Sequence, residues 1–386
     1  MKSMLTNQVL DQDSSEEEVA ELVETVKRSP AQRDALVELL PEQNPVYRGR
    51  GTNQTIHMRG YILAAFEQVG LPEQALPYVL DELQNGRDAY AVAGAAKALR
   101  GLQNPSDELI PFLFKAVNNI RYMDDSLSFA RYKPDWPLAD STSALQEIFQ
   151  SFQWLGSHAQ HAQNALSDLE ALYHDGGFSE SIRREIKNAI DAIQANEPAV
   201  THTFISLSIL AAPLADQQKP DMVPNPTFED QEKNRLVYAE FFCQKPSIVV
   251  FFYTRCNNPN KCSLTITKLG QLQQLIRDEG LEGGLKTAAI TYDPDYDLPA
   301  RLKAYGLNRG VSFSEDHRFL RALDERKKLQ DYFGLGVNFN GSIVNQHRIE
   351  LFILDHQGRI AKMFARLQWD LREVLDSAKI LLPQKR

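Results

Sequence analysis

The hydrophobic pattern of this chain changes once, near residue 196, and that change limits what the chain can fold into. From about Glu16 to Asn196, apolar residues recur at spacings of three and four, which predicts amphipathic α-helices. After a short stretch rich in Pro, Asn and Asp, predicted strands and helices alternate instead. The 386 residues also exceed what one ordinary hydrophobic core supports. We therefore expect two domains, at residues 1–196 and 226–386, joined by a linker at residues 197–225.

A weak internal repeat runs through the helical half. Pro72 is matched by Pro105, 33 residues later, and Pro77 by Pro111, 34 residues later. Each unit predicts a helix, a Pro-containing turn and a second helix, and repeats near this length form solenoids of stacked helical pairs. The small-residue run Ala91–Leu99 allows neighbouring helices to approach closely and resembles the inner helix of HEAT-like repeats. We therefore predict an all-α HEAT-like solenoid that binds a protein partner.

The helical half also contains an irregular segment and a group of histidines. Residues 119–141 are rich in Asp, Tyr and Pro and predict an inserted irregular loop. His158 and His161 lie one helical turn apart, with His174 downstream, and are a candidate metal site. No carboxylate or cysteine pattern accompanies these histidines, so ordinary surface or core histidines are the favoured interpretation.

Charge and hydropathy exclude several classes of function. The net charge of −9 and pI near 5.5 argue against a broad nucleic-acid surface, which needs a basic face. The stretch Met1–Glu18 lacks the basic and apolar regions of a secretory signal. No run of about 18 apolar residues predicts a transmembrane segment. Taken at face value, the sequence predicts a cytoplasmic protein without a nucleic-acid partner.

The C-terminal part has the pattern of an α/β domain. Ser247–Tyr253 is apolar throughout, as a central buried strand is, and a helix is predicted at Ser263–Glu279. Further strands are predicted at Arg235–Phe242, Lys286–Tyr292, Glu350–Asp355 and Ile360–Phe364, and further helices from Pro299, at Arg318–Asp331 and at Trp369–Leu382. This order is typical of a thioredoxin-like fold.

Two of the three cysteines lie where such a fold carries its chemistry. Cys256 and Cys262 lie between the central strand and the following helix, where the helix dipole lowers the pKa of a thiol. His347 directly precedes another predicted strand. Two thiols and one imidazole at strand ends predict a soft-metal or redox site. The third cysteine, Cys243, is predicted to pack as a small apolar side chain.

These segments resemble the SCO/SenC family, thioredoxin-like copper chaperones of cytochrome c oxidase assembly that are also discussed as thiol-disulfide reductases. The resemblance rests on the segments Phe251–Cys262, Ile290–Tyr305 and His347–Gly358, and covers roughly residues 222 to 384. Family members usually have three residues between the two cysteines and a proline after the second. This chain has five residues there, and Ser263 follows the second cysteine.

The resemblance implies specific roles for four residues. Cys256 and Cys262 would be thiolate ligands of copper(I) or copper(II), and His347 would be the imidazole ligand. Asp293 would support the site without binding the metal. Three ligands of this kind favour copper over structural zinc, which usually takes four. The family also implies a copper-receiving partner and a periplasmic or membrane-associated location.

Our main hypothesis is therefore a protein that handles copper, thiol redox or both for the assembly of a metalloprotein of the cytochrome oxidase type. Its helical domain would bind a protein partner. One alternative is an enzyme, a thiol-disulfide oxidoreductase or peroxidase-like redoxin in which Cys256 attacks and Cys262 resolves. His347 would then be dispensable. Another alternative is an interaction scaffold whose redox domain is a relict.

Overall fold

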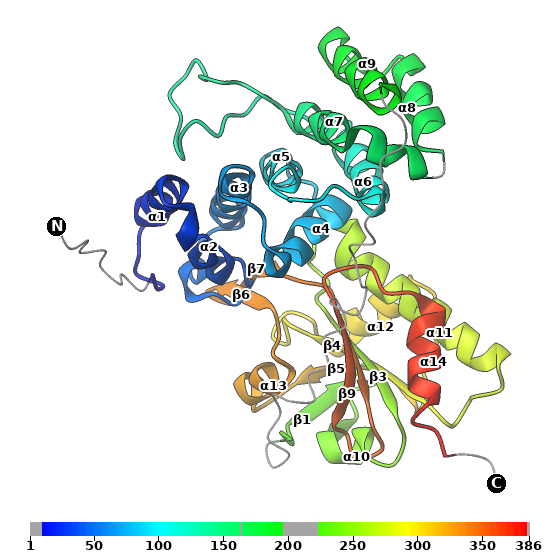
Figure 1. Ribbon diagram of the computed structural model, residues 1–386. Coiled ribbons are helices and arrows are strands. Elements are labelled where there is room, and N and C mark those ends of the chain that lie inside the picture. Colours follow the sequence, from blue (N-terminus) through cyan, green and yellow to red (C-terminus); the bar gives the residue numbers. More distant parts are fainter. Residues whose placement is uncertain (1–9, 163, 196–222, 384–386) are drawn as a thin grey trace. The chain divides into compact units, whose positions relative to one another are not determined.

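The structure is a computed structural model that describes residues 10–162, 164–195 and 223–383 (Figure 1). The chain divides into two compact units, Met1–Ser206 with Asn338–Asn340 and Leu207–Val337 with Gly341–Arg386. The predicted linker lies almost entirely outside the described residues, so its boundaries stay a prediction. No helix within the described ranges is long and apolar enough to cross a membrane.

The N-terminal part is helical, as predicted. Its helices are α1 (Glu16–Arg28), α2 (Asp34–Leu39), α3 (Thr52–Val69), α4 (Leu76–Asn85), α5 (Ala89–Leu99), α6 (Ile110–Ile120), α7 (Ala144–Leu155), α8 (Ala165–His174) and α9 (Glu180–Gln194). Helix α3 packs on α5, α5 on α7 and α7 on α9, while α4 packs on α6 (Figure 1). An all-α architecture is confirmed, whereas a HEAT-like solenoid remains a prediction.

Small residues allow α3 and α5 to lie very close together. A Cβ atom at Gly94 of α5 would lie 2.3 Å from the backbone oxygen of Gly60 of α3, so only glycine fits there. An ionic network extends the contact to α7. Arg100, the residue after α5, binds Glu67 of α3 at 2.7 Å and Glu147 of α7 at 2.5 Å. The predicted close approach of helices at Ala91–Leu99 is therefore present.

The predicted inserted loop connects α6 to α7 without a helix of its own. Leu127 and Thr142 exchange two backbone hydrogen bonds, of 2.9 and 2.8 Å, and so close its base. Tyr132 is buried and packs edge-on against the rings of His57 and Tyr61. The loop is thus anchored to α3 by aromatic contacts.

The C-terminal unit is built on a seven-stranded sheet in the order β2-β1-β5-β4-β3-β8-β9. Its strands are β1 (Thr227–Asp230), β2 (Arg235–Val237), β3 (Ser247–Phe252), β4 (Lys286–Thr291), β5 (His317–Ala322), β8 (Glu350–Leu354) and β9 (Ile360–Ala365). Strands β3, β4 and β5 are parallel, and β8 pairs antiparallel with β3. A separate two-stranded sheet joins β6 (Val337–Asn340) to β7 (Ile343–His347).

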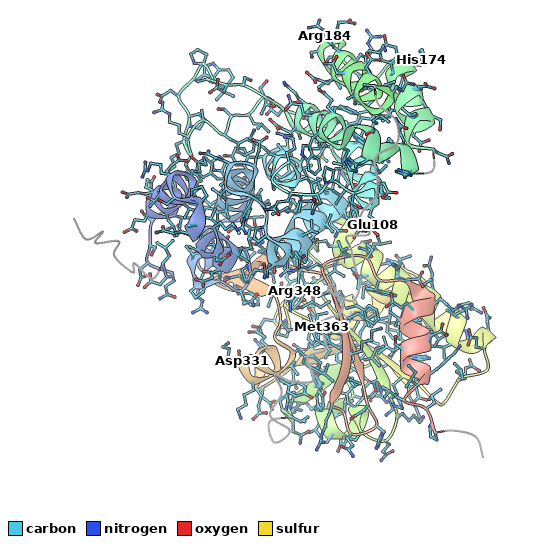
Figure 2. The ribbon with its side chains drawn as sticks, in the orientation of Figure 1. Glu108, His174, Arg184, Asp331, Arg348 and Met363 are labelled. Atoms are coloured by element: carbon cyan, nitrogen blue, oxygen red, sulfur yellow. The ribbon has the colours of Figure 1, made fainter. Side chains whose placement is uncertain are left out.

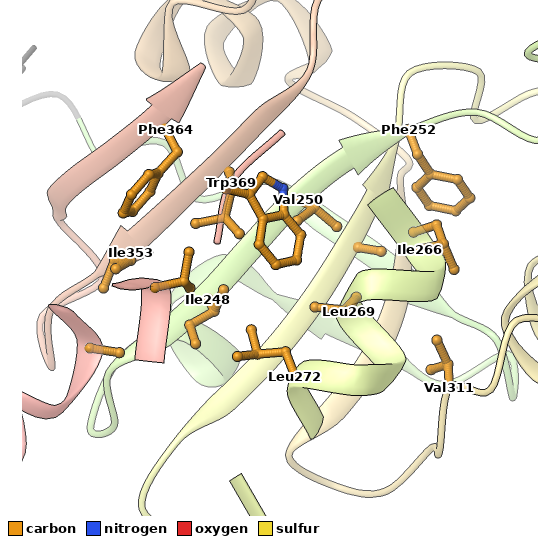
Figure 3. Close-up of a cluster of buried hydrophobic side chains, with 14 of the residues drawn as sticks. Ile248, Val250, Phe252, Ile266, Leu269, Leu272, Val311, Ile353, Phe364 and Trp369 are labelled. Carbon is orange, nitrogen blue, oxygen red and sulfur yellow. The ribbon is translucent and has the colours of Figure 1, made fainter. Parts of the chain in front are cut away.

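Helices cover both faces of this sheet, as in a thioredoxin-like α/β fold. They are α10 (Tyr238–Phe242), α11 (Leu264–Asp278), α12 (Pro299–Leu307), α13 (Arg326–Phe333) and α14 (Leu371–Lys379). On one face, Ile248, Val250 and Phe252 of β3 pack against α11 and Trp369 (Figure 3). On the other face, Phe251 packs against Phe333 of α13, with ring centroids 5.0 Å apart. Burial on both faces explains why β3 is apolar throughout.

The prediction of a strand at Arg235–Phe242 is wrong beyond Val237. Residues Tyr238–Phe242 form helix α10 instead. The carboxylate of Glu240 accepts a hydrogen bond of 3.0 Å from the Val237 backbone N–H, which caps the helix start. The aromatic residues of this segment favour strands in isolation. Tertiary packing outweighs that preference here, because the three aromatic side chains of α10 are all buried.

The prediction of a helix at Arg318–Asp331 is wrong over its first half. Residues His317–Ala322 form strand β5, and helix α13 begins only at Arg326. Two arginines of β5 are paired with carboxylates of β1, the neighbouring strand. Arg318 binds Asp230 at 2.7 Å and Arg321 binds Glu229 at 2.5 Å. These partners are about 90 residues away in sequence, so local periodicity could not reveal them.

Candidate metal centre

The two cysteines are held on one irregular turn between β3 and α11. Cys256 lies in the loop after β3, and Cys262 lies in a π-helical turn, Pro259–Ser263, that leads directly into α11. The Asn258 side chain accepts a hydrogen bond of 2.9 Å from the Asn260 backbone N–H and starts this turn. A wider turn accommodates the five residues between the cysteines and brings both side chains to the same place.

His347 is presented by the last residue of β7 in a defined tautomer. Its Nδ1 atom lies 3.1 Å from the backbone carbonyl oxygen of Arg348. A carbonyl oxygen only accepts hydrogen bonds, so Nδ1 carries a proton and donates it there. The other nitrogen, Nε2, is therefore the one that faces the two sulfur atoms and can bind a metal ion. The ring is further fixed by an edge-on contact with Tyr253, whose ring centroid is 5.2 Å away.

The three predicted ligands converge. The Nε2 atom of His347 lies 3.3 Å from Cys256 Sγ and 3.6 Å from Cys262 Sγ. All three donor atoms lie within 4.8 Å of one another, and both cysteines are free thiols. Elsewhere in the described chain, no other group of three His, Cys, Asp or Glu side chains meets this condition. Two sulfur atoms and one imidazole nitrogen suit a soft cation or a dithiol–disulfide couple.

The alternative histidine site in the N-terminal part does not form such a group. His158 and His161 lie in a 3₁₀ turn, Gly156–His161, that precedes α8. His174 lies at the opposite end of α8 (Figure 2). Its ring packs edge-on against Tyr173. The interpretation of these residues as ordinary histidines is consistent with this arrangement.

Access to the centre is from the Cys256 side. The exposed fractions of Cys262 and His347 are 2% and 6%. Cys256 is half-buried and packs at the edge of the same core. A metal ion or an oxidant that arrives from solvent therefore meets Cys256 first.

The two thiols have opposite acidities. The hydrogen bond from the Cys262 thiol, together with the charge and hydrogen bond of the His347 ring, lowers the pKa of Cys256 to about 3. Burial and the neighbouring Cys256 raise the pKa of Cys262 well above its ordinary value. A thiolate is the form that binds metal and attacks disulfides. Cys256 is thus ready for either reaction at neutral pH, whereas Cys262 must lose a proton as the metal binds.

A buried polar network holds the segment that carries His347. The Glu350 carboxylate is fully buried and accepts hydrogen bonds from Arg348 Nε at 2.7 Å and from the Gly336 backbone N–H at 2.8 Å. Tyr292 completes the network, because its hydroxyl donates to the same carboxylate at 2.5 Å. Since the carbonyl of Arg348 orients His347, this network fixes the imidazole indirectly. Sequence analysis missed Glu350, for which only its position three residues after His347 offered a signal.

Asp293 lies beside the centre and does not contribute a ligand atom to it. It is buried, and its carboxylate accepts a hydrogen bond of 3.0 Å from Arg255 Nε, next to Cys256. Asp297, which sequence analysis also missed, accepts from the Thr254 backbone N–H at 3.1 Å. Burial raises the pKa of Asp297. Both carboxylates hold the strand end that precedes Cys256, which fits the supporting role predicted for Asp293.

Comparisons with known proteins concern the C-terminal part of the chain. The family model SCO1/SenC matches residues 215–381. No curated protein matches the chain. Among solved structures, an SCO1/SenC family lipoprotein from Bacillus anthracis is 19% identical and matches over 41% of this chain and 94% of its own, with a TM-score of 0.37. Yeast Sco1 is 24% identical and matches over 43% of this chain and 99% of its own, with a TM-score of 0.33. Bradyrhizobium japonicum ScoI with copper bound is 18% identical and matches over 41% of this chain and 98% of its own, with a TM-score of 0.34.

Proposed function

Because residues 215–381 match the SCO1/SenC family model, we propose that this protein binds copper through Cys256, Cys262 and His347. The observation that most supports the proposal is the convergence of the three donor atoms within 4.8 Å. The protonated Nδ1 of His347 leaves Nε2 directed at the two sulfur atoms. Copper is also present in the solved structure of the Bradyrhizobium japonicum relative.

The donor set suits copper in both of its common oxidation states. Thiolates and an imidazole bind copper(I), and copper(II) would add a water molecule or another oxygen ligand. Cys256 offers a thiolate in advance, and its partial exposure lets the ion enter and leave. A site with one accessible ligand fits an ion that is carried and passed on. We therefore propose that copper is a cargo for the assembly of a metalloprotein, of the cytochrome oxidase type, and that the helical domain binds a protein partner.

The test is a titration of the reduced full-length protein with copper(I) in competition with a chelator of known affinity. We expect one copper ion per chain. Cys256→Ser and Cys262→Ser should abolish tight binding, and His347→Ala should weaken it by at least about tenfold. Matched controls are Cys243→Ser and His356→Ala. Cys243 contacts the Gln357 carbonyl in a different part of the domain, and His356 is an exposed residue next to Gln357. Unchanged copper retention in either site cysteine variant would refute the proposal.

Thiol-disulfide exchange is a second candidate, supported by the unequal acidities of the two thiols. A low-pKa Cys256 could attack a substrate disulfide, and Cys262, within 4.8 Å, could then displace the reduced product and form an internal disulfide. In this reaction His347 is not a reacting group. Exchange activity that persists in a His347→Ala variant that binds no copper, although slowed by the higher pKa of Cys256, would favour this second function over the first.

A further inference from the structure

The surface beside Cys256 carries an unusual local charge. Three arginines lie at or close to the cysteine turn, although the whole chain has a net charge of −9. Arg255 directly precedes Cys256, and Arg301 and Arg309 come from helix α12 and the residues after it. Since the buried ligands leave Cys256 as the accessible one, a carrier that exchanges metal with this centre must approach this surface.

The first part of this surface is a stack built on one tyrosine. The guanidinium carbon of Arg255 lies 4.1 Å from the centre of the Tyr296 ring, and that of Arg301 lies 3.8 Å from it. Arg301 also donates a hydrogen bond to the backbone oxygen of Tyr296. Arg255 also donates a hydrogen bond from Nε to the buried carboxylate of Asp293. These contacts order both guanidinium groups on the Tyr296 ring, and one of them belongs to the residue that precedes Cys256.

The second part of this surface lies beside Cys262 and is again an arginine stacked on a tyrosine ring. Arg309 stacks on the Tyr305 ring at 3.5 Å and donates from Nε to the Ser263 hydroxyl at 3.0 Å. The Tyr305 ring packs in turn against Phe252, at the end of β3, with centroids 5.4 Å apart. Arg309 is therefore tied both to the residue after Cys262 and to the domain core.

The acidic groups nearby do not neutralise these arginines. Asp293 and Asp297 are buried, and Asp295 is paired with Arg326 at 2.7 Å. Within the described part of the chain, neither Arg301 nor Arg309 has a carboxylate at ion-pair distance. Two arginines beside the entrance thus keep an uncompensated positive charge, and their stacking limits the entropy that binding a partner would cost.

We propose that this arginine–tyrosine rim, made of Arg255, Tyr296, Arg301, Tyr305 and Arg309, is the docking surface for an acidic protein that exchanges metal with the Cys256 centre. The identity of the cargo rests on the proposed function. Arginine and tyrosine are among the side chains most enriched at the energetic centres of protein interfaces. Tyr296 is 38% exposed, and its neighbour Leu298 is 49% exposed, so the rim also offers apolar contact area. Carboxylates around the partner's metal site would complement the rim and steer its approach.

The experiment uses two synthetic peptides with the same Cys-x-x-Cys core, flanked by glutamates in one and by lysines in the other. Each is loaded with copper(I), and the rate of transfer to the full-length apo protein is measured at low and high salt. The test variant is Arg301→Glu with Arg309→Glu, and Arg301→Gln with Arg309→Gln is the milder version. The control variant is Arg235→Glu with Arg359→Glu, two exposed arginines in β2 and in the β8–β9 turn.

We expect transfer from the glutamate-flanked peptide to be faster, and the advantage to shrink as salt is added. Charge reversal at the rim should slow that transfer by at least about tenfold, whereas the control variant should leave it unchanged. The equilibrium affinity for copper(I), measured against a chelator, should stay the same in all variants, which also confirms folding. Equal rates from the two peptides, or an equal effect of the control variant, would overturn the proposal.

Failure of the proposed function gives a different result. If the protein binds no copper(I), the rim is tested by the fluorescence anisotropy of labelled peptides in which serines replace the cysteines. Preferential binding of the glutamate-flanked peptide, lost in the rim variant, would support the docking surface without copper. No preference between the two peptides would overturn it.

Discussion

Replacing Glu350 with glutamine should destabilise the C-terminal domain far more than the loss of an ordinary surface charge. The carboxylate is fully buried, and the Arg348 side chain that it pairs with is only 12% exposed. Glutamine keeps the size of the side chain and removes its charge. The variant therefore leaves the Arg348 guanidinium largely buried without its counter-charge.

The expected loss follows from the burial of this pair. Removing one partner of a buried ion pair costs about 3–5 kcal/mol, whereas an exposed pair contributes less than about 1 kcal/mol. The glutamine oxygen can still accept from the Gly336 N–H and from Arg348 Nε. We therefore expect a loss near the lower limit, about 3 kcal/mol. Copper(I) affinity should also fall by about 10- to 100-fold, because Arg348 orients His347.

The assay is urea unfolding of the apo protein, followed by the fluorescence of Trp369. This tryptophan is 3% exposed and lies in the core of the C-terminal domain. The two other tryptophans belong to the N-terminal part and are replaced with phenylalanine, so that the signal reports one domain. The matched control is Asp331→Asn, which removes an exposed ion pair with Lys327. A loss for Glu350→Gln no larger than that of the control would refute the reasoning.

Two further predictions concern the thiols and the helical half. Iodoacetamide should modify Cys256 at a rate that stays constant between pH 5 and 8, because its pKa of about 3 keeps it ionised throughout. An ordinary thiol would lose about tenfold in rate per pH unit below its pKa near 8.5. Cys262→Ala, which removes the hydrogen bond to Cys256, should move Cys256 toward that behaviour, as mass spectrometry of the modified residue would report. Gly94→Ala should lower the free energy of unfolding of the helical part by about 1–3 kcal/mol, since the added Cβ would lie 2.3 Å from the Gly60 oxygen. Gly176→Ala, which meets nothing within 4 Å, should be nearly neutral in the same thermal or urea unfolding measurement.

The sequence revealed those features of the site that depend on residue type and on local pattern. An uninterrupted apolar run identified β3 as a central strand, and the position of Cys256 and Cys262 after it indicated the loop that carries the chemistry. His347 was found because it precedes another apolar strand. Strand ends of one sheet meet at common edges, so residues at such ends can be grouped before the structure is known.

The features that could not be predicted from the sequence depend on contacts between residues that are far apart along the chain. Strand β5 was predicted as part of a helix, because the sequence does not show that its arginines pair with Asp230 and Glu229, two strand residues about 90 positions earlier. The buried position of Glu350 is equally invisible, since a glutamate in a strand reads as an exposed residue until Arg348 and Tyr292 are found around it. Polar residues in a core are satisfied by tertiary contacts, which periodicity does not encode.

The spacing of the two cysteines does not by itself decide the geometry of the centre. Lys261, just before Cys262, departs from helical geometry, with φ of −104° and ψ of −105°. The same residue donates from Nζ to the backbone carbonyl of His347 at 3.1 Å. The longer turn therefore supplies a direct contact between the segment that carries the thiols and the strand that carries the imidazole. With that contact in place, the five-residue spacing brings the two sulfur atoms and the imidazole nitrogen within 4.8 Å of one another.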